Sequence, residues 1–292
     1  MRIAISLDME GISGTVSFKQ IVAGNHFGSP GNPEFERAQR LATGDVNAAI
    51  AGAREAGATR FFVHDTHWLD EINLLLDELD ESAEYVGGQP LLLWEDLGPD
   101  YDAAFLIGYH ARAGQVGIMS HVYSDLICDL RLNGQPAGEG ALAAALAGYY
   151  DVPTVLVSGD DCVCAEMRDW CPAIETAQTK VSISRYAARC LPVKGAQATI
   201  KAAARRAVTG LANPGRFGPP CPPLKIQPPI TLEVRWRNHQ TARSVALMPG
   251  VELVGLETSR FTHADFAIVD RALKAMLHIA MSPVNAGHVQ MP

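Results

Sequence analysis

The chain has 292 residues, 48% of them hydrophobic and 19% charged, which is enough apolar material for one large folded domain or for one domain with a smaller appendage. The net charge is −8 and no run of five or more Lys or Arg residues occurs. Nucleic-acid binding is therefore not expected, because it depends on neutralising phosphates.

The N-terminus does not resemble a targeting signal. The apolar stretch that begins at Met1 is short and meets an acid at Asp8, whereas a signal peptide needs a longer apolar core and a small-residue cleavage site. No window approaches eighteen apolar residues, so no membrane span is expected. These features predict a cytoplasmic protein.

Strand and helix patterns alternate through the first two thirds of the chain. The expected strands cover residues 2–7, 60–63, 103–107 and 152–157, and the expected helices cover residues 34–56 and 139–149. Strands separated by helices imply crossover connections. The sequence therefore predicts an α/β fold with a mainly parallel sheet flanked by helices.

The composition changes between residues 211 and 230, where seven prolines exclude a helix and indicate an extended linker. We predict an α/β domain over residues 1–210, a proline-rich linker over 211–230, and a small C-terminal α+β unit over 231–292. That unit is expected to contain strands at 231–236 and 251–256 and a helix at 264–280.

The six cysteines do not form a C-x-x-C pair, so a zinc ribbon is not expected. A disulfide framework is also not expected in a chain of this size without an export signal. If the protein binds a metal, the ligands must be His, Asp and Glu.

Acidic residues and histidines follow three of the expected strands. Asp8 and Glu10 follow the first, His67 the second and His110 the third. In open α/β sheets ligands bind at the carboxyl ends of the strands, so these side chains are expected to meet. Two carboxylates at positions i and i+2 of an extended segment face the same way and repel each other unless a cation or proton lies between them.

Glu139 begins the Ala-rich helix, after the turn signal Asn133-Gly134. Taken singly, each acid or histidine has an ordinary structural explanation; Glu139, for example, suits the first turn of a helix. Together they form a ligand set that zinc or manganese accepts. Two neighbouring metals usually share a bridging carboxylate, and Asp8 is the natural candidate.

Several segments resemble, in the same order, the motifs of the DppA-type zinc D-aminopeptidases. The first, residues 6–14, resembles the family's S-x-D-x-E-G-I-S-G opening. The others are His64-Asp65-Thr66-His67, Phe105-Leu106-Ile107-Gly108-Tyr109-His110-Ala111, Met119-Ser120-His121, Asn133-Gly134-Gln135-Pro136-Ala137-Gly138-Glu139, Gly148-Tyr149-Tyr150-Asp151-Val152-Pro153 and Gly159-Asp160-Asp161. The chain departs from the family at His64, at Trp68, in an insert at residues 24–33 and in the proline-rich linker.

The resemblance implies two zinc ions per chain, with manganese also compatible. It places the zinc ligands on Asp8, Glu10, His67, His110 and Glu139, with Asp8 bridging, and the catalytic histidine on His121. It further implies a homo-oligomer, a ring-shaped decamer, that acts on short peptides with a D-residue at the amino end.

The leading hypothesis is a dinuclear zinc aminopeptidase that hydrolyses the N-terminal amide bond of short peptides or aminoacyl amides through a metal-activated bridging water, with D-residues preferred. An L-aminopeptidase or a non-peptide amidase on the same site is an alternative. A magnesium phosphatase of the haloacid-dehalogenase kind is another, because residues 8–11 and Asp160-Asp161 imitate its acidic motifs. A metal-stabilised binding protein without catalysis is the last.

Overall fold

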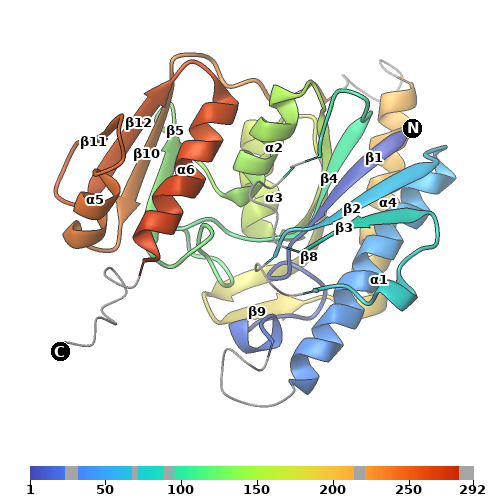
Figure 1. Cartoon of the computed structure of the whole chain (residues 1–292). Coiled ribbons are helices and arrows are strands. Elements are labelled where there is room, and N and C mark those ends of the chain that lie inside the picture. The colour runs from blue at the N-terminus through green and yellow to red at the C-terminus, as the bar shows by residue number, and fades with distance from the viewer. Residues whose placement is uncertain (24–31, 68–71, 89–93, 95, 214–220, 283–292) are drawn as a thin grey trace.

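Two β-sheets form the framework of the protein in a computed structural model (Figure 1). The structure describes residues 1–23, 32–67, 72–88, 94, 96–213 and 221–282. Most of the insert at 24–33, Trp68 and the centre of the proline-rich segment lie outside these residues. Among the described helices, none combines the length and apolar character that crossing a bilayer would require.

The larger sheet has seven strands in the order β3-β2-β1-β4-β7-β8-β9. The first six strands pair in parallel and only β9 is antiparallel to its neighbour. The strands are β1 (Arg2–Leu7), β2 (Arg60–Asp65), β3 (Ala83–Val86), β4 (Ala103–Tyr109), β7 (Thr154–Asp160), β8 (Glu175–Ser184) and β9 (Ala187–Cys190). The prediction of a mainly parallel sheet is confirmed.

Helices cover both faces of this sheet. On one face α1 (Pro33–Glu55) packs against α4 (Val193–Ala212), and on the other α2 (Glu139–Tyr149) lies beside α3 (Asp161–Trp170) (Figure 1). The side chain of Asn32 caps α1 and Pro33 occupies its first turn. Helix α2 is buried along its length because its alanines and glycines allow close packing on all sides.

The second sheet has five antiparallel strands in the order β11-β12-β10-β5-β6. They are β10 (Ile230–Trp236), β11 (Val251–Leu253), β12 (Thr258–His263), β5 (Ile127–Leu132) and β6 (Gln135–Pro136). Asn133 and Gly134 both have positive φ and form the tight turn between β5 and β6, which confirms the turn signal. The second sheet thus takes two strands from the middle of the chain, and the proposed division at residues 210 and 230 stays a prediction.

Helices α5 (His239–Val245) and α6 (Phe266–Ala280) accompany the second sheet, and two short 3₁₀ helices, η1 (Phe18–Gln20) and η3 (Leu76–Glu78), lie in loops of the larger unit. Helix α6 contacts β10 and β12 and also α2 (Figure 1). It therefore joins the second sheet to the helix that begins with Glu139.

Candidate metal centre

The centre lies at the point in the large sheet where the order of successive strands reverses. Strands β1 and β4 are neighbours, and β2 and β3 extend the sheet to one side while β7 and β8 extend it to the other. This switch point is where open α/β sheets bind ligands. The N–H of Asp8 donates to the carbonyl of Ile107 at 2.8 Å, so the loop after β1 starts directly beside the end of β4.

Two glycines allow the loops after β1 and β4 to cross. The N–H of Gly11 donates to the carbonyl of Gly108 at 2.7 Å. A Cβ atom at Gly11 would lie 1.8 Å from the carbonyl oxygen of Tyr109, and one at Gly108 would lie 2.0 Å from that of Asp8. Gly108 also has φ of +79°, which favours glycine. The crossing brings the acids of one loop onto the histidine of the other.

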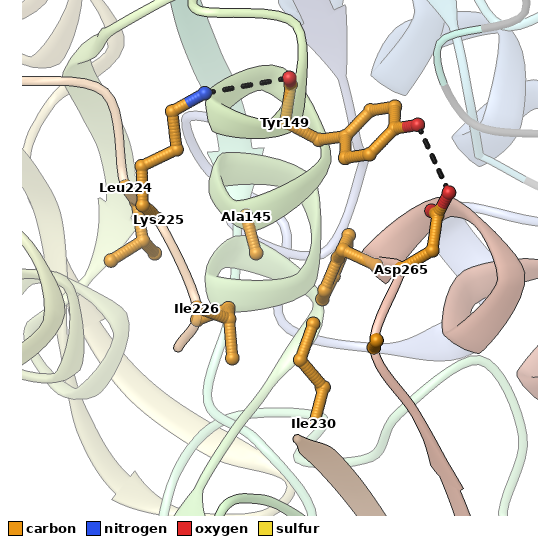
Figure 2. Close-up of a pocket in the computed structure, with 9 residues that line it drawn as sticks. Ala145, Tyr149, Leu224, Lys225, Ile226, Ile230 and Asp265 are labelled. Carbon is orange, nitrogen blue, oxygen red and sulfur yellow. Dashed lines mark hydrogen bonds between the residues drawn. The ribbon is translucent and has the colours of Figure 1, made fainter. Parts of the chain in front are cut away.

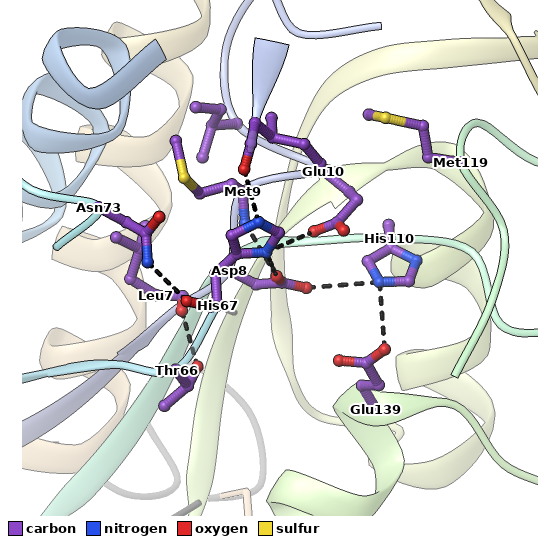
Figure 3. A network of polar contacts seen from close by, with 12 residues as sticks. Leu7, Asp8, Met9, Glu10, Thr66, His67, Asn73, His110, Met119 and Glu139 are labelled. Atoms are coloured by element: carbon purple, nitrogen blue, oxygen red, sulfur yellow. Dashed lines mark hydrogen bonds and ion pairs between the residues drawn. The ribbon is translucent and has the colours of Figure 1, made fainter. Parts of the chain in front are cut away.

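Asp8 is at the centre of the cluster (Figure 3). Its Oδ1 lies 3.0 Å from Nδ1 of His67, and its Oδ2 lies 3.4 Å from Nε2 of His110. Glu10 Oε2 is 3.2 Å from the same His67 nitrogen, and Glu139 Oε1 is 3.4 Å from the same His110 nitrogen. All five predicted ligands are therefore brought together. Asp8 and Glu10 converge through a turn rather than along a strand, because β1 ends at Leu7.

Each histidine of the cluster uses one ring nitrogen to contact a backbone carbonyl. His67 Nε2 lies 2.8 Å from the carbonyl of Ile21, and His110 Nδ1 lies 2.9 Å from that of Ala111. A carbonyl only accepts hydrogen bonds, so these nitrogens carry the protons. Without a cation the neighbouring carboxylates outweigh burial and raise the pKa of both histidines. In the neutral form that binds a metal, the second nitrogen of each ring would present its lone pair on the side of the carboxylates. This is the arrangement of metal-binding histidines, whose other N–H is oriented by an acceptor.

The atoms that face one another here lack ordinary partners. Asp8 Oδ2, Glu10 Oε2 and His110 Nε2 are buried, and none has a hydrogen-bond partner within the described part of the chain. Burial and the charge of Glu10 raise the pKa of Asp8 to about 8. Buried acceptors directed at one another require a cation or a proton between them. The donor set and its unsatisfied atoms therefore fit bound metal.

Asp8 belongs to two groups of three residues, and within each group the ligand atoms all lie within 4.8 Å of one another. One contains Glu10 and His67, and the other contains His110 and Glu139. A third such group joins Glu10 and His110 to His121. The geometry therefore offers more than one position for an ion, with Asp8 common to two of them.

His121 lies beside the cluster on the loop between β4 and β5. Its Nδ1 donates to the carbonyl of Met119 at 2.8 Å, and its Nε2 lies 3.7 Å from Glu10 Oε1 and 3.8 Å from Glu139 Oε1. Its ring stacks on His110 with centroids 4.4 Å apart. Burial, followed by the charge of His110, lowers the pKa of His121. At neutral pH the ring is therefore uncharged and Nε2 can accept a proton.

The loop around His121 has an unusual backbone. Met119 and Tyr123 both adopt positive φ, at 47° and 55°, although neither is glycine. The N–H of Tyr123 donates to Glu139 Oε1 at 2.7 Å. Such conformations are sparsely populated and persist where surrounding contacts enforce them. The side chains of His121 and Glu139 are 13% and 14% exposed, against 1% for His110, so the centre opens on this side.

Sequence reasoning missed the residues that support the ligands. Lys180 on β8 is buried and donates to the carbonyl of Glu10, and Asn73 donates to the carbonyl of His67 at 2.5 Å. Asp45 on α1 accepts two hydrogen bonds from Ser13. No local pattern marks these positions, and the contacts of Lys180 and Asp45 join segments that are 170 and 32 residues apart in the sequence.

Two other sequence features have structural roles away from the cluster. Asp160 caps α3 by accepting from the N–H of Val163, and its second oxygen accepts from the N–H of Ala111. Both oxygens of its carboxylate are thus engaged by backbone donors. His64, a departure from the family motif, lies 3.3 Å from Asp96 and packs edge-on against Trp94.

A cavity of about 320 Å³ lies at the opposite end of α2, beside residues 224–226 (Figure 2). Tyr149 on its rim contacts Asp265 at 3.3 Å and Lys225 at 3.5 Å. An 11-residue helix is roughly 16 Å long, so this cavity is remote from Glu139 at the start of α2.

Three comparisons relate the chain to known proteins. The M55 peptidase family model, described as D-aminopeptidase, matches residues 1–275. A D-aminopeptidase of Bacillus subtilis (strain 168) is 33% identical over 285 residues, which cover 96% of this chain and 98% of that protein. A solved structure described as the Zn-dependent D-aminopeptidase DppA from Bacillus subtilis, a self-compartmentalizing protease, superimposes with a TM-score of 0.86. It is 31% identical and covers 96% of this chain and 98% of its own. The chain therefore belongs to the M55 family of D-aminopeptidases.

Proposed function

We propose that the protein is a dinuclear zinc aminopeptidase that hydrolyses the N-terminal amide bond of short peptides or aminoacyl amides whose first residue has the D configuration. The observation that carries this proposal is the buried cluster in which Asp8 Oδ1 faces His67 and Asp8 Oδ2 faces His110. The zinc dependence and D-aminopeptidase activity described for the relatives support the same reading.

The proposed ligands are Asp8 and Glu10 after β1, His67 after β2, His110 after β4 and Glu139 at the start of α2. Asp8 would bridge the two ions, because each of its oxygens points to a different histidine. Imidazole and carboxylate ligands of this kind suit zinc and also manganese. The alternative ligand His121 is the most exposed of the three histidines, which favours a role toward substrate.

When bound, two zinc ions would polarise the scissile carbonyl and lower the pKa of a water shared between them. The chain's own contribution to proton movement falls to His121. Its Nδ1–H is fixed to the carbonyl of Met119, so Nε2 is the nitrogen that can take a proton and pass it to the leaving amine. The stacked ring of His110 holds the imidazole in this orientation.

We also propose a homo-oligomer, a ring of ten copies, in the cytoplasm. The relative described as self-compartmentalizing supports assembly. Large apolar side chains on and near the β8–β9 hairpin are exposed, Ile183 by 65%, Tyr186 by 66% and Val116 by 80%, and would be covered by a second copy. Six free cysteines fit a reducing compartment.

The test is to purify the protein without chelators, measure metal per chain, and assay paired D- and L-aminoacyl amides and short peptides. About two zinc ions per chain with hydrolysis of the D-series is the expected result. Two zinc ions with activity only on L-substrates or other amides would contradict the proposed substrate but support the proposed metal site. Zinc without hydrolysis of any amide would favour a binding protein, and absence of a transition metal would overturn the proposal.

A further inference from the structure

A partly buried cation on α6 is the feature from which we infer a substrate contact. The ammonium group of Lys274 lies over the ring of Tyr123, with Nζ 3.5 Å from the ring centroid. Burial lowers the pKa of Lys274, and the charges of Asp270 and Glu139 oppose that shift. Among the described residues it meets no carboxylate within ion-pair distance and no hydrogen-bond acceptor, although Asp270 lies one helical turn away.

Lys274 is also close to the candidate metal centre. The N–H of Tyr123, the residue whose ring lies under the ammonium group, donates to Glu139 Oε1 at 2.7 Å. Glu139 and His121 lie on the more open side of the centre. Lys274 is thus linked to a proposed zinc ligand through one residue, Tyr123, and the charge of Glu139 acts on its ammonium group.

Several observations indicate that this cation awaits a partner. A buried ammonium group normally has carboxylate or carbonyl acceptors, because unpaired buried charge is unfavourable. Lys180, a fully buried lysine near the centre, uses all three of its donors. Close by, the Tyr123 hydroxyl and Asp270 Oδ2 are likewise buried without partners in the described structure. The left-handed backbone of Tyr123 directs its aromatic ring beneath Lys274.

We propose that Lys274 binds the C-terminal carboxylate of a dipeptide substrate and makes the enzyme selective for dipeptides over substrates without that carboxylate. This inference rests on the proposed aminopeptidase function. It adds which group of the substrate the enzyme recognises on the leaving-amine side of the scissile bond, namely the carboxylate. The ring of Tyr123 positions the ammonium group by a cation–π contact.

A dipeptide brings its carboxylate close to the scissile bond. In a dipeptide only one Cα separates the scissile nitrogen from the carboxylate, so the two groups are within about 4 Å of each other. A cation that is near enough to Glu139 for their charges to interact could therefore meet the carboxylate while the scissile amide lies at the metal centre. A longer peptide would place a neutral amide at the same point and leave the ammonium group unpaired.

The test compares D-alanyl-D-alanine with its C-terminal amide, which has the same scissile bond and no carboxylate. For the intact enzyme we expect kcat/KM to favour the free dipeptide. In Lys274→Met that preference should fall roughly 10- to 100-fold. The fall should come from a lower kcat/KM for the free dipeptide, while kcat/KM for the amide stays unchanged. Lys274→Arg should retain part of the preference. Arg271→Met, which removes an exposed positive charge from the same helix, is the matched control and should leave it unchanged.

The outcomes separate the two proposals. If the zinc-loaded enzyme hydrolyses neither compound nor any other D-aminoacyl substrate, the aminopeptidase function itself fails. If it hydrolyses both compounds equally, or if Lys274→Met slows both to the same extent with zinc content and melting temperature intact, the carboxylate contact is wrong. If Arg271→Met also loses the preference for the free dipeptide, then the preference arises from the general positive charge of the helix, and the proposed contact with Lys274 is wrong.

Discussion

The ammonium group of Lys180 lies beneath Glu10 and donates to its backbone carbonyl at 2.8 Å. Its other hydrogen bonds go to the carbonyl oxygen of Thr15 at 2.6 Å and to the Thr15 hydroxyl at 3.0 Å. Lys180 is 1% exposed and comes from β8, some 170 residues beyond the loop that it supports. A buried cation thus holds the backbone of the loop whose carboxylates face the opposite way, toward the metal centre.

Replacing Lys180 with Met should destabilise the fold and weaken zinc binding together. Buried acceptors left without donors cost about 1–3 kcal/mol each, so the free energy of unfolding should fall by several kcal/mol. Denaturant unfolding and competitive zinc titration would measure both effects. Lys201→Met is the matched control, because Lys201 is exposed and pairs with Glu55 on the surface, where ion pairs contribute about 0–1 kcal/mol. Equal effects in the two variants would contradict the supporting role.

A methyl group at Gly11 should disrupt the crossing of the two loops. Its Cβ would lie 1.8 Å from the backbone oxygen of Tyr109, so the backbone must move and the ligands on both loops must move with it. We expect Gly11→Ala to lose zinc and to melt at a lower temperature. Gly210→Ala provides the contrast, since nothing lies within 4 Å of that position in α4 and alanine favours helix by about 1 kcal/mol. A zinc-replete Gly11→Ala protein would refute the close approach.

Removing the carboxylate of Asp8 should empty both metal positions. Its two oxygens face His67 and His110, so an Asp8→Ala protein would lose a ligand to each ion at once. Glu139→Ala, in contrast, should retain more metal, because Glu139 belongs to only one of the two groups that share Asp8. Metal analysis of the two purified variants would check this. Stoichiometric zinc in Asp8→Ala would rule out a bridging role.

The stability of the loop after β1 should depend on pH through Asp45. Burial raises the pKa of Asp45 from its ordinary value of 3.8 to about 6, despite two hydrogen bonds from Ser13. Between these values the folded state binds more protons than the unfolded state, so this group's contribution to stability is present below pH 3.8 and declines as the pH rises to 6. The change is roughly 3 kcal/mol across that window.

Asp45→Asn removes this titration and tests it. The difference in unfolding free energy between Asp45→Asn and the parent should shift in favour of the variant as the pH rises from about 4 to 6, and should be constant above that range. Chemical denaturation at several pH values would measure it. A difference that does not vary with pH would show that Asp45 titrates normally.

Local patterns predicted the strands and helices that carry the site. The strand at residues 2–7 and the helix at 139–149 have the predicted bounds, because an apolar run before Asp8 and an Ala-rich segment after a turn are strong local signals. The gathering of Asp8, Glu10, His67 and His110 followed from the rule that the carboxyl ends of parallel strands meet. Glu139 begins a helix, and the family resemblance assigned it to the site.

Features created by distant pairing could not be predicted in the same way. Strand β5 at Ile127–Leu132 joins the C-terminal strands through β10, about 100 residues later, and nothing in its own sequence indicates that partner. The same is true of Lys180 beneath Glu10 and of Lys274 over Tyr123. Neither lysine differs locally from a surface lysine, and only the tertiary packing buries Lys180 and places Lys274 over the Tyr123 ring.

His121 should be separable from the metal ligands by mutation. Its Nε2 is more than 3.5 Å from both neighbouring carboxylates, and its ring is held by Met119 and by stacking on His110, so its removal leaves the five ligand side chains in place. We expect His121→Ala to bind two zinc ions and to lose 10²- to 10⁴-fold in kcat, the usual contribution of a positioned acid or base. His278→Ala, at an exposed position on α6, is the control and should behave as the parent. If His121→Ala loses zinc in proportion to its activity, then the third ligand group, with Glu10 and His110, describes a real coordination site and His121 is a ligand.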